Sequence, residues 1–359
     1  MSFLKFLLLP FAMFYDVVMN VRNRLYDLKI KPSVAFDIPV IGVGNLAVGG
    51  TGKTPMTEYL IRLLSTHYKV VTLSRGYGRK TKGFRIAGNQ DSALTIGDEP
   101  YQMFKKYAPT INVAVGEDRA LAIPMILQET SETDVVVMDD AFQHRRVIPG
   151  FSILLTEYYK PFFDDHVLPY GRLREGPEGA QRADALVVTK CPDHLEDDQT
   201  MKMESTIRKY STKPIFFSRI RYGEPVPFGD LTKKISPKII LLTGIANTHT
   251  LVEYVKKNFI LVKHFSFSDH YDFKPSDLQR VWDIFQNKQD EKVGKISILT
   301  TEKDRAKLES DALKPIIANL PIFYLPIETE FLRNGKDFDA LIVSFMNSFN
   351  PAYRQAGCE

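Results

Sequence analysis

The chain has 359 residues, of which 44% are hydrophobic and 25% are charged, and its formal net charge is +4. This composition is typical of a soluble globular protein with two domains, or with one large domain and an appended lobe, and the small net charge gives no indication of a nucleic-acid partner. Two cysteines, Cys191 and Cys358, lie far apart and lack metal-ligand spacing. We therefore expect a reducing compartment and no disulfide framework.

The first 19 residues are mostly apolar, but Lys5, Pro10 and Asp16 interrupt them, so the stretch is too short and too broken to predict a spanning helix. No small-residue cleavage site follows, which argues against a secretory signal. The next charged residues are mainly basic: Arg22, Arg24, Asp27, Lys29 and Lys31. This order favours an amphipathic helix within residues 1–30 that lies in the interface of an anionic membrane. The alternative is a helix whose apolar face packs on its own domain.

Residues 43–54 form a glycine-rich run, Val-Gly-Asn-Leu-Ala-Val-Gly-Gly-Thr-Gly-Lys-Thr. An apolar run at residues 38–43 predicts a strand before it, and residues 55–65 predict a helix after it. This setting indicates a phosphate-binding loop for a nucleoside triphosphate, although Ala47 stands where the strict pattern has glycine. The predicted ligands of the phosphates are Gly49, Gly50, Thr51, Gly52, Lys53 and Thr54. Lys53 would reach the β- and γ-phosphates and Thr54 would ligate Mg²⁺; a glycine-rich turn with a solvated lysine is the alternative.

A basic loop follows the second predicted strand, residues 70–73. Residues 69–85 carry six basic side chains and no acid, which suits phosphate binding or a solvated hairpin equally well. Further along, Asp98 opens a predicted helix at residues 99–107. From the residues alone, Asp98 is either a helix cap or a carboxylate that accepts a proton from an attacking hydroxyl.

Residues 134–138 predict an apolar strand, and Asp139 and Asp140 follow it directly. Behind a phosphate loop, a neighbouring strand is expected to deliver an aspartate to Mg²⁺ or its waters. Because adjacent residues of a strand point to opposite sides, one carboxylate would serve the metal and the other a turn or a substrate group. The polar residues up to Arg146 would lie at the carboxyl edge of the sheet, where open α/β folds bind ligands.

Short apolar runs alternate with helical stretches from residue 38 to about residue 221, which predicts a mainly parallel sheet flanked by helices in the manner of phosphate-loop NTPases. A turn-rich stretch at residues 222–237 separates this part from a second alternating set. We therefore expect an N-terminal helix at 1–30, a nucleotide-binding domain at 31–221 and a smaller α/β lobe at 222–359. The sequence leaves open whether the segments after Ile322 complete the second lobe or return to the first.

Taken together, these segments resemble one family, the tetraacyldisaccharide 4′-kinases of lipid A biosynthesis. The resemblance extends from the N-terminal apolar helix to residues 301–304, and an ordered set of motifs carries it: residues 42–45, 49–55, 74–79, 97–100, 116–119, 139–144, 173–175 and 269–271. It implies ATP, Mg²⁺ and transfer of the γ-phosphoryl group to the 4′-hydroxyl of a tetraacylated glucosamine disaccharide 1-phosphate. It also implies peripheral attachment to the cytoplasmic face of the inner membrane of a Gram-negative bacterium.

The resemblance also assigns roles to residues. It implies a base at Asp98 supported by His270, and acids on the metal side at Asp139 and Asp140. From the phosphate-loop chemistry, Lys53 is expected to neutralise charge on the transferred group. Contacts to the lipid head group would come from Glu99, Arg119, Gln143, Arg174 and Glu175. One departure is visible: Ala141 stands where the family commonly has glycine, which would cost about 1 kcal/mol if that position requires a positive φ.

Two rival functions belong to other classes. A regulatory or metallochaperone-like GTPase would need an Asn-Lys-x-Asp guanine reader; the nearest stretches are residues 189–192, which lack the aspartate, and residues 301–304, which have the wrong spacing. A nucleotide-binding membrane scaffold would consume no ATP in response to an acceptor. We expect no nucleic-acid partner and infer no obligate protein partner.

Overall fold

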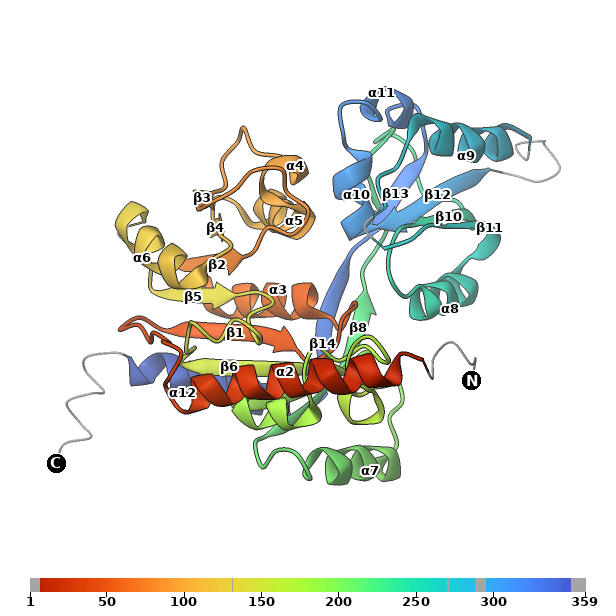
Figure 1. The fold of residues 1–359 in the computed structure, drawn as a ribbon. Coiled ribbons are helices and arrows are strands. Elements are labelled where there is room, and N and C mark those ends of the chain that lie inside the picture. Colours follow the sequence, from red (N-terminus) through yellow and green to blue (C-terminus); the bar gives the residue numbers. More distant parts are fainter. Residues whose placement is uncertain (1–6, 131, 270, 288–294, 350–359) are drawn as a thin grey trace.

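The computed structural model describes residues 7–130, 132–269, 271–287 and 295–349, and its two sheets form two lobes (Figure 1). The first lobe has a nine-stranded sheet in the order β14-β8-β7-β6-β1-β5-β2-β4-β3. Its inner strands are parallel, and the edge strands β14 and β3 are antiparallel to their neighbours. The strands are β1 (Val40–Asn45), β2 (Val70–Ser74), β3 (Arg85–Ile86), β4 (Asn112–Val115), β5 (Val135–Met138), β6 (Phe151–Glu157), β7 (Ala185–Thr189), β8 (Ile215–Tyr222) and β14 (Ile327–Arg333). The predicted class, a mainly parallel sheet of the phosphate-loop type, is confirmed.

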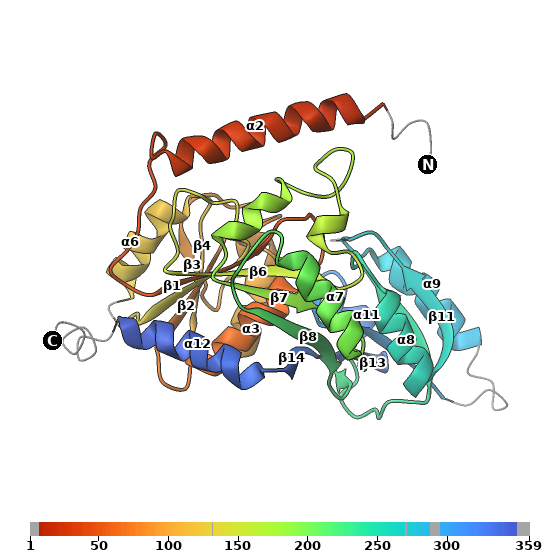
Figure 2. The same ribbon diagram turned by 90° about the horizontal axis from the view of Figure 1, so that it is seen from below.

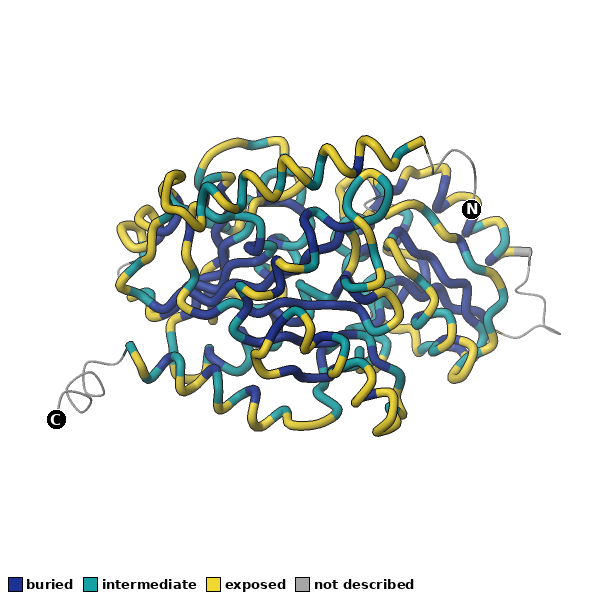
Figure 3. Tube along the Cα trace, turned by 60° about the horizontal axis from the view of Figure 1, so that its bottom comes forward, coloured by how far each residue is buried: buried dark blue, intermediate teal, exposed yellow. Residues whose placement is uncertain are grey.

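Helices cover both faces of this sheet because its inner strands are buried on both sides (Figure 3). Ile41 and Val43 of β1 pack in the cluster that contains helices α3 and α12, whereas Val40 packs in the cluster that contains α6. The helices and short 3₁₀ turns of this lobe are α3 (Lys53–Leu64), α4 (Ala93–Ile96), α5 (Asp98–Tyr107), α6 (Arg119–Glu129), η1 (Phe162–Asp164), η2 (Pro177–Arg182), α7 (Asp197–Ile207) and α12 (Gly335–Ser348). The alternation of apolar side chains along the strands thus fixes two core layers.

The second lobe has a five-stranded sheet in the order β11-β10-β12-β13-β9, with only β9 antiparallel. Its strands are β9 (Val226–Pro227), β10 (Lys238–Thr243), β11 (Ile260–Ser266), β12 (Ile296–Thr301) and β13 (Ile322–Leu325). Helices α9 (Pro275–Asn287), α10 (Glu302–Leu308) and α11 (Lys314–Ile317) contribute to one core cluster, and α8 (His249–Asn258) contributes to the other. The smaller lobe is therefore also a sheet between helices.

Two neighbouring strands carry the chain between the lobes. The chain leaves the first lobe after β8 and returns through β14, which pairs with β8 along most of its length (Figure 1). The amide of Gly223 donates to the carbonyl of Pro326 at 2.9 Å, where the two segments meet the second lobe. This decides the placement that the sequence leaves open: β13 completes the second sheet, and β14 and α12 return to the first. Phe338 of α12 is fully buried there.

The N-terminal helix α2 (Leu9–Asp27) lies along the outside of the first lobe (Figure 2). Ala12 is its buried residue, while its large apolar side chains are exposed over a third to nearly three quarters of their surface: Leu9, Phe11, Met13, Phe14, Val17, Val18 and Val21. Among the described residues, no helix has both the length and the apolar character that crossing a bilayer requires. The apolar side chains of α2 are thus on the surface, and its polar side chains bind the lobe.

Candidate active site

The phosphate-binding loop joins β1 to α3, as the sequence predicts. Two of its glycines have positive φ, 110° at Gly49 and 91° at Gly52, which L side chains rarely adopt. Gly52 is the N-cap of α3, so Lys53 and Thr54 stand on its first turn. Backbone N–H groups and the positive end of the helix dipole therefore surround one point, which is the arrangement that binds phosphate oxygens.

Side chains behind the loop hold its carbonyl groups. The hydroxyl of Thr189, at the end of β7, donates to the Thr51 carbonyl at 2.8 Å, and the Lys190 ammonium donates to the Gly50 carbonyl. Lys190 has a φ of 55° and also pairs with the buried Glu157 at 2.7 Å. Because these carbonyls are bound from one side, the loop peptides keep a fixed orientation. Sequence reasoning considered Lys190 only as part of a guanine reader and missed this role.

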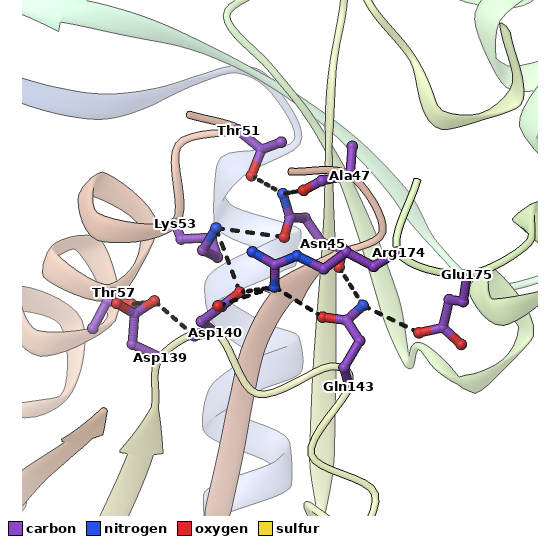
Figure 4. Close-up of polar contacts among 10 residues, drawn as sticks. All are labelled: Asn45, Ala47, Thr51, Lys53, Thr57, Asp139, Asp140, Gln143, Arg174 and Glu175. Carbon is purple, nitrogen blue, oxygen red and sulfur yellow. Dashed lines mark hydrogen bonds and ion pairs between the residues drawn. The ribbon is translucent and has the colours of Figure 1, made fainter. Parts of the chain in front are cut away.

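The same loop is held from within by Asn45, the last residue of β1. Its amide nitrogen donates to the Ala47 carbonyl at 2.6 Å and to the Thr51 hydroxyl at 2.7 Å (Figure 4). Its amide oxygen lies 3.4 Å from the Lys53 ammonium. Asn45 therefore connects the loop backbone to the lysine that the sequence assigns to the phosphates. The motif at residues 42–45 was the available signal for it, although the sequence did not assign Asn45 a role.

Replacing Thr189 with valine should raise the KM for ATP about five-fold and leave kcat nearly unchanged. The side-chain shape is kept, but the hydroxyl that is shared between the Thr51 carbonyl at 2.8 Å and the Thr156 carbonyl at 3.2 Å is lost. Steady-state kinetics measures both constants. Thr130→Val, which removes a hydroxyl bonded at 2.6 Å to the Ile126 carbonyl on α6, is the matched control. An unchanged KM in Thr189→Val would show that the bond does not orient the loop.

The two adjacent aspartates after β5 have different surroundings. Asp139 is buried, and burial together with the nearby Glu99 raises its pKa to about 7. Burial alone would also raise the pKa of Asp140, but Lys53 and Arg174 outweigh it and lower that pKa. The Lys53 ammonium lies 3.5 Å from Asp140 Oδ1. Lys53 therefore stands between the phosphate loop and the carboxylate pair (Figure 4).

Asp139 and Thr54 fit the Mg²⁺ that the sequence predicts. A buried carboxylate beside like charges is stabilised as an anion by a divalent cation, and carboxylate and hydroxyl oxygens are ligands that Mg²⁺ accepts. Both residues line the same cavity as the phosphate loop. The positive φ of this turn falls on Asp140, at 49°, and Ala141 is absent from the residues with positive φ, so the Ala141 departure carries no such strain in the described chain.

A hydrogen-bonded network extends from Asp140 to the loop that carries Arg174 (Figure 4). Arg174 Nη1 lies 3.0 Å from both oxygens of Asp140 and 3.1 Å from Gln143 Oε1. Gln143 Nε2 in turn donates to the Asn45 carbonyl at 2.8 Å and to Glu175 Oε1 at 3.1 Å. Three of the residues assigned to the lipid head group are thus joined to one another and to the carboxylate pair.

Arg119 is placed differently. It is only 4% exposed, and burial lowers the pKa of its guanidinium although Asp140 and Asp139 oppose the shift. Its backbone N–H donates to His144 Nε2 at 3.2 Å, and burial lowers the pKa of His144 to about 4, so that imidazole is neutral near pH 7. Arg119 is therefore buried near the carboxylate pair and is not part of the cavity wall.

A cavity of about 730 Å³ lies between the two lobes. The first lobe contributes the phosphate loop (residues 48–55), two residues of the basic loop (Arg75 and Tyr77), and the polar side chains of Asp98, Glu99, Asp139, Asp140 and Arg174. The second lobe contributes, among others, Asp269, Thr301, Glu302 and Lys303. Gln143, Glu175 and Arg119 are outside this lining. The structure therefore gathers most of the predicted site residues around one space, whereas His270 lies outside the described residues.

Asp98 is not the cap of α5. The helix begins at Asp98 and its N-cap is Gly97, which has a φ of 97°. The Asp98 carboxylate instead pairs with Lys307 of the second lobe at 3.1 Å. The cap interpretation is wrong because the chain turns one residue earlier, at a glycine, and this leaves Asp98 on the cavity wall.

Residues 189–192 and 301–304, the two candidate guanine-recognition stretches, make other contacts in the structure. Lys190 binds the phosphate loop, as described above. Asp304 is buried, and its Oδ2 accepts from the Gly244 amide at 2.9 Å and from the Thr301 hydroxyl at 2.7 Å. A guanine-reading aspartate would have to present its carboxylate to the base, so the GTPase alternative gains no support.

Comparison with known proteins agrees with this geometry. The family described as tetraacyldisaccharide-1-P 4′-kinase matches residues 4–347. Proteins named tetraacyldisaccharide 4′-kinase from Flavobacterium johnsoniae and Bacteroides thetaiotaomicron are each 40% identical, over 96% and 97% of this chain and 98% and 95% of their own lengths. The crystal structure of LpxK from Aquifex aeolicus in complex with ATP is 30% identical, with a TM-score of 0.72 over 96% of this chain and 99% of that one. The chain therefore belongs to the tetraacyldisaccharide 4′-kinase family.

Proposed function

We propose that this kinase transfers the γ-phosphoryl group of ATP to the 4′-hydroxyl of a tetraacylated glucosamine disaccharide 1-phosphate, a step of lipid A biosynthesis. Family membership supports the reaction, and one observation supports its location. Lys53 stands between a phosphate-binding loop and two carboxylates at the wall of the interlobe cavity. That combination suits a triphosphate whose terminal group faces an acceptor.

ATP would lie along the cavity. Its phosphates would bind residues 49–54, and its adenine would lie at the apolar end near the strands that join the lobes. That end is lined by Ile220, Tyr222, Ile245, Leu325 and Ile327, with Asn247 and Thr250 beside them as hydrogen-bonding groups. Flat apolar surfaces with a few polar groups are typical of sites for a base. Mg²⁺, held by Thr54, Asp139 and the phosphates, would supply charge neutralisation at the transferred group.

In the proposed reaction the protein contributes proton transfer, charge neutralisation and positioning. Asp98 accepts the proton of the sugar 4′-hydroxyl as that oxygen attacks the γ-phosphorus in line. The bond from the γ-phosphorus to the β–γ bridging oxygen breaks, ADP leaves, and Lys53 neutralises charge on the transferred group. Asp140 keeps Lys53 and Arg174 in place through the contacts described above. Glu99, Arg174, Gln143 and Glu175 would hold the head group, and Arg119 would support them from behind; His270 would assist Asp98.

We further propose that the enzyme is a peripheral protein of the cytoplasmic face of the inner membrane, with α2 in the membrane interface. The exposed apolar side chains of α2 support this, since their burial in lipid is favourable. The polar side of α2 contacts the loops of the site: Tyr15 donates to the Arg174 carbonyl at 2.9 Å, Arg22 to the Gln143 carbonyl at 2.8 Å, and Asn23 to Glu175 at 2.6 Å. The bilayer that holds the acyl chains would thus lie beside the acceptor site.

Replacing Phe11 and Phe14, which are 66% and 72% exposed, with aspartate should reduce sedimentation with anionic vesicles at least about ten-fold, because each phenylalanine loses a burial worth about 1.5–3 kcal/mol. Met201→Asp, on the exposed side of α7, is the control. These substitutions leave the three bonds to the site loops in place, whereas removal of residues 1–25 would weaken membrane association and break those bonds as well. Unchanged sedimentation would refute the membrane role of α2.

The reaction itself is tested with radiolabelled ATP and purified disaccharide 1-phosphate lipid, with the product separated by chromatography. We expect label in the lipid only when the acceptor is present, and competition by unlabelled ATP. Hydrolysis that does not depend on the acceptor, or labelling blocked by GTP in preference to ATP, would overturn the proposal.

A further inference from the structure

Two helices from different lobes face each other with opposite charges at their ends. Helix α5 of the first lobe carries Asp98 at its first residue and Lys106 in its last turn, and α10 of the second lobe carries Glu302 at its first residue and Lys307 in its last turn. Lys307 pairs with Asp98 at 3.1 Å, and Lys106 pairs with Glu302 at 2.9 Å. Each pair joins the beginning of one helix to the end of the other, so the helices are antiparallel and each acid lies at a positive helix end.

The Lys106–Glu302 pair lies at the other end of the contact between α5 and α10 and connects that contact to α3. The Lys106 ammonium also bonds Glu58 of α3 at 2.7 Å, and Glu58 is almost fully buried. Burial raises the pKa of Glu58, so its charged form depends on Lys106. Lys106 therefore ties α10 to the core of the first lobe at a point away from Asp98.

Lys307 is unusual for a lysine because its side chain is nearly buried. That side chain is 7% exposed, and its ammonium donates to the Tyr271 carbonyl at 3.2 Å. Asp272 lies 3.7 Å away, but its side chain is 96% exposed and so interacts weakly through solvent. Asp98 is the partner of Lys307 that lines the cavity, whereas Lys307 is outside the cavity lining. The ammonium thus contacts the Asp98 carboxylate from outside the cavity lining.

We infer that Lys307 is a positioning residue through which the second lobe holds the Asp98 carboxylate in the orientation that accepts the acceptor proton. The inference rests on the proposed function, in which Asp98 is the base. Because Lys307 belongs to α10 and Asp98 to α5, the base is correctly set only while the two lobes are in contact. Binding of ATP between the lobes and readiness of the base are then linked through one ion pair.

The test uses the full-length enzyme and compares Lys307→Gln, Lys307→Arg and Arg305→Gln in single-turnover reactions across pH. Arg305 is the matched control, since it is a cation of the same helix that pairs with Glu309 at 2.8 Å and stacks on Tyr324. We expect Lys307→Gln to lower the phosphoryl-transfer rate about 10- to 100-fold near pH 7, with the KM for ATP within about two-fold. Arg305→Gln should leave both unchanged.

The pH dependence of the rate distinguishes this role from a purely structural one, because a purely structural role of Lys307 would not shift the acidic limb of the profile. An ammonium close to a carboxylate favours its ionised form, so its loss should move the acidic limb of the rate profile about one unit toward higher pH, and Lys307→Arg should restore the limb. Glu99 on the same helix, the Asp269–Lys303 pair of the second lobe at 3.0 Å, and Asp272 also face this region, but they are identical in all variants. A limb that stays in place, or that moves equally in Arg305→Gln, would overturn the inference.

A double variant separates this inference from the proposed function. If Lys307 acts through Asp98, adding Lys307→Gln to Asp98→Asn should cause no further loss of rate, because the group on which Lys307 acts is gone. A further loss would overturn the inference while leaving Asp98 as the base. Near-normal turnover of Asp98→Asn alone would overturn both. If Lys307→Gln does not fold, Lys307→Met takes its place, because it keeps the apolar stem and also removes the charge. The same shift of the acidic limb toward higher pH is expected, and an unmoved limb would overturn the inference.

Discussion

Replacing Asp98 with asparagine should lower kcat by about 10³-fold or more while leaving the affinity for ATP within about two-fold. The amide keeps the size of the side chain but cannot accept the proton of the sugar hydroxyl. ATP affinity should be preserved because, in the proposed mode of binding, its phosphates are held by residues 49–54 and not by Asp98. Steady-state kinetics with the lipid acceptor, together with calorimetric titration of an ATP analogue, measures the two quantities separately.

Asp311→Asn is a matched control for this substitution, because Asp311 is 96% exposed and pairs at 2.7 Å with Lys314, a neighbouring lysine on its own segment. It should leave kcat unchanged. If Asp98→Asn loses ATP affinity in proportion to kcat, the carboxylate contributes to nucleotide binding and another group must be the base. The asparagine also removes the charge that faces Lys307, so thermal unfolding of the variant should be compared with that of Asp311→Asn.

Replacing Lys53 with methionine should lower kcat/KM for ATP by about 10³-fold, through both a higher KM and a lower kcat. The Lys53 side chain is 14% exposed, and its ammonium lies within 3.5 Å of Asn45 and Asp140, so the charge is held in position by the protein itself. Loss of its charge removes an interaction that strengthens as charge develops on the transferred group. The buried Asp139 also loses a neighbouring cation that lowers its pKa.

Lys53→Arg should not restore activity, because the planar guanidinium places its charge further from Cα than the ammonium does. Lys69→Met is the control, since Lys69 is 68% exposed and pairs with Glu132 at the surface. A Lys53→Met enzyme with normal kcat and a raised KM would show that this lysine binds the ground state and the transition state equally.

Much of the fold follows from local pattern. The apolar runs at residues 70–73, 134–138 and 185–188 become β2, β5 and β7 because strands buried on both faces need apolar side chains in both directions. The order of the strands in the sheet cannot be derived from local pattern. Strand β1 lies between β5 and β6, and β5 separates β1 from β2. That order depends on which crossovers pack, which is a property of the whole chain. The return of β14 to β8 is equally non-local, since more than a hundred residues separate the two strands.

The residues of the candidate site also fall into two groups, those that a local sequence pattern predicts and those that depend on contacts between distant parts of the chain. Gly49, Gly52, Lys53 and the aspartates after β5 are predictable because their chemistry depends on a strand–turn–helix pattern within a few residues. Lys307 is not predictable, because its partner Asp98 is over two hundred residues away in the other lobe. Thr189 and Lys190 act on backbone carbonyls, and no sequence pattern indicates which carbonyls need a partner. The motif at residues 42–45 includes Asn45 but does not show that its side chain bonds the loop. Gln143 and Glu175 came from family resemblance, and the structure joins them to Arg174 through hydrogen bonds.

Because the chain leaves the larger lobe after β8 and returns to it in β14, the smaller lobe is an insertion in the larger one. Its entry and exit points, Gly223 and Pro326, are one hydrogen bond apart, so a short turn could close the first sheet with its strand order intact. The connection between the lobes is also a two-stranded ribbon with ladder bonds in its plane, which bends across that plane far more easily than its strands slide past each other. Any change in the angle between the lobes would therefore occur by bending of this ribbon, and it would have to break the Asp98–Lys307 and Lys106–Glu302 ion pairs that join the lobes here.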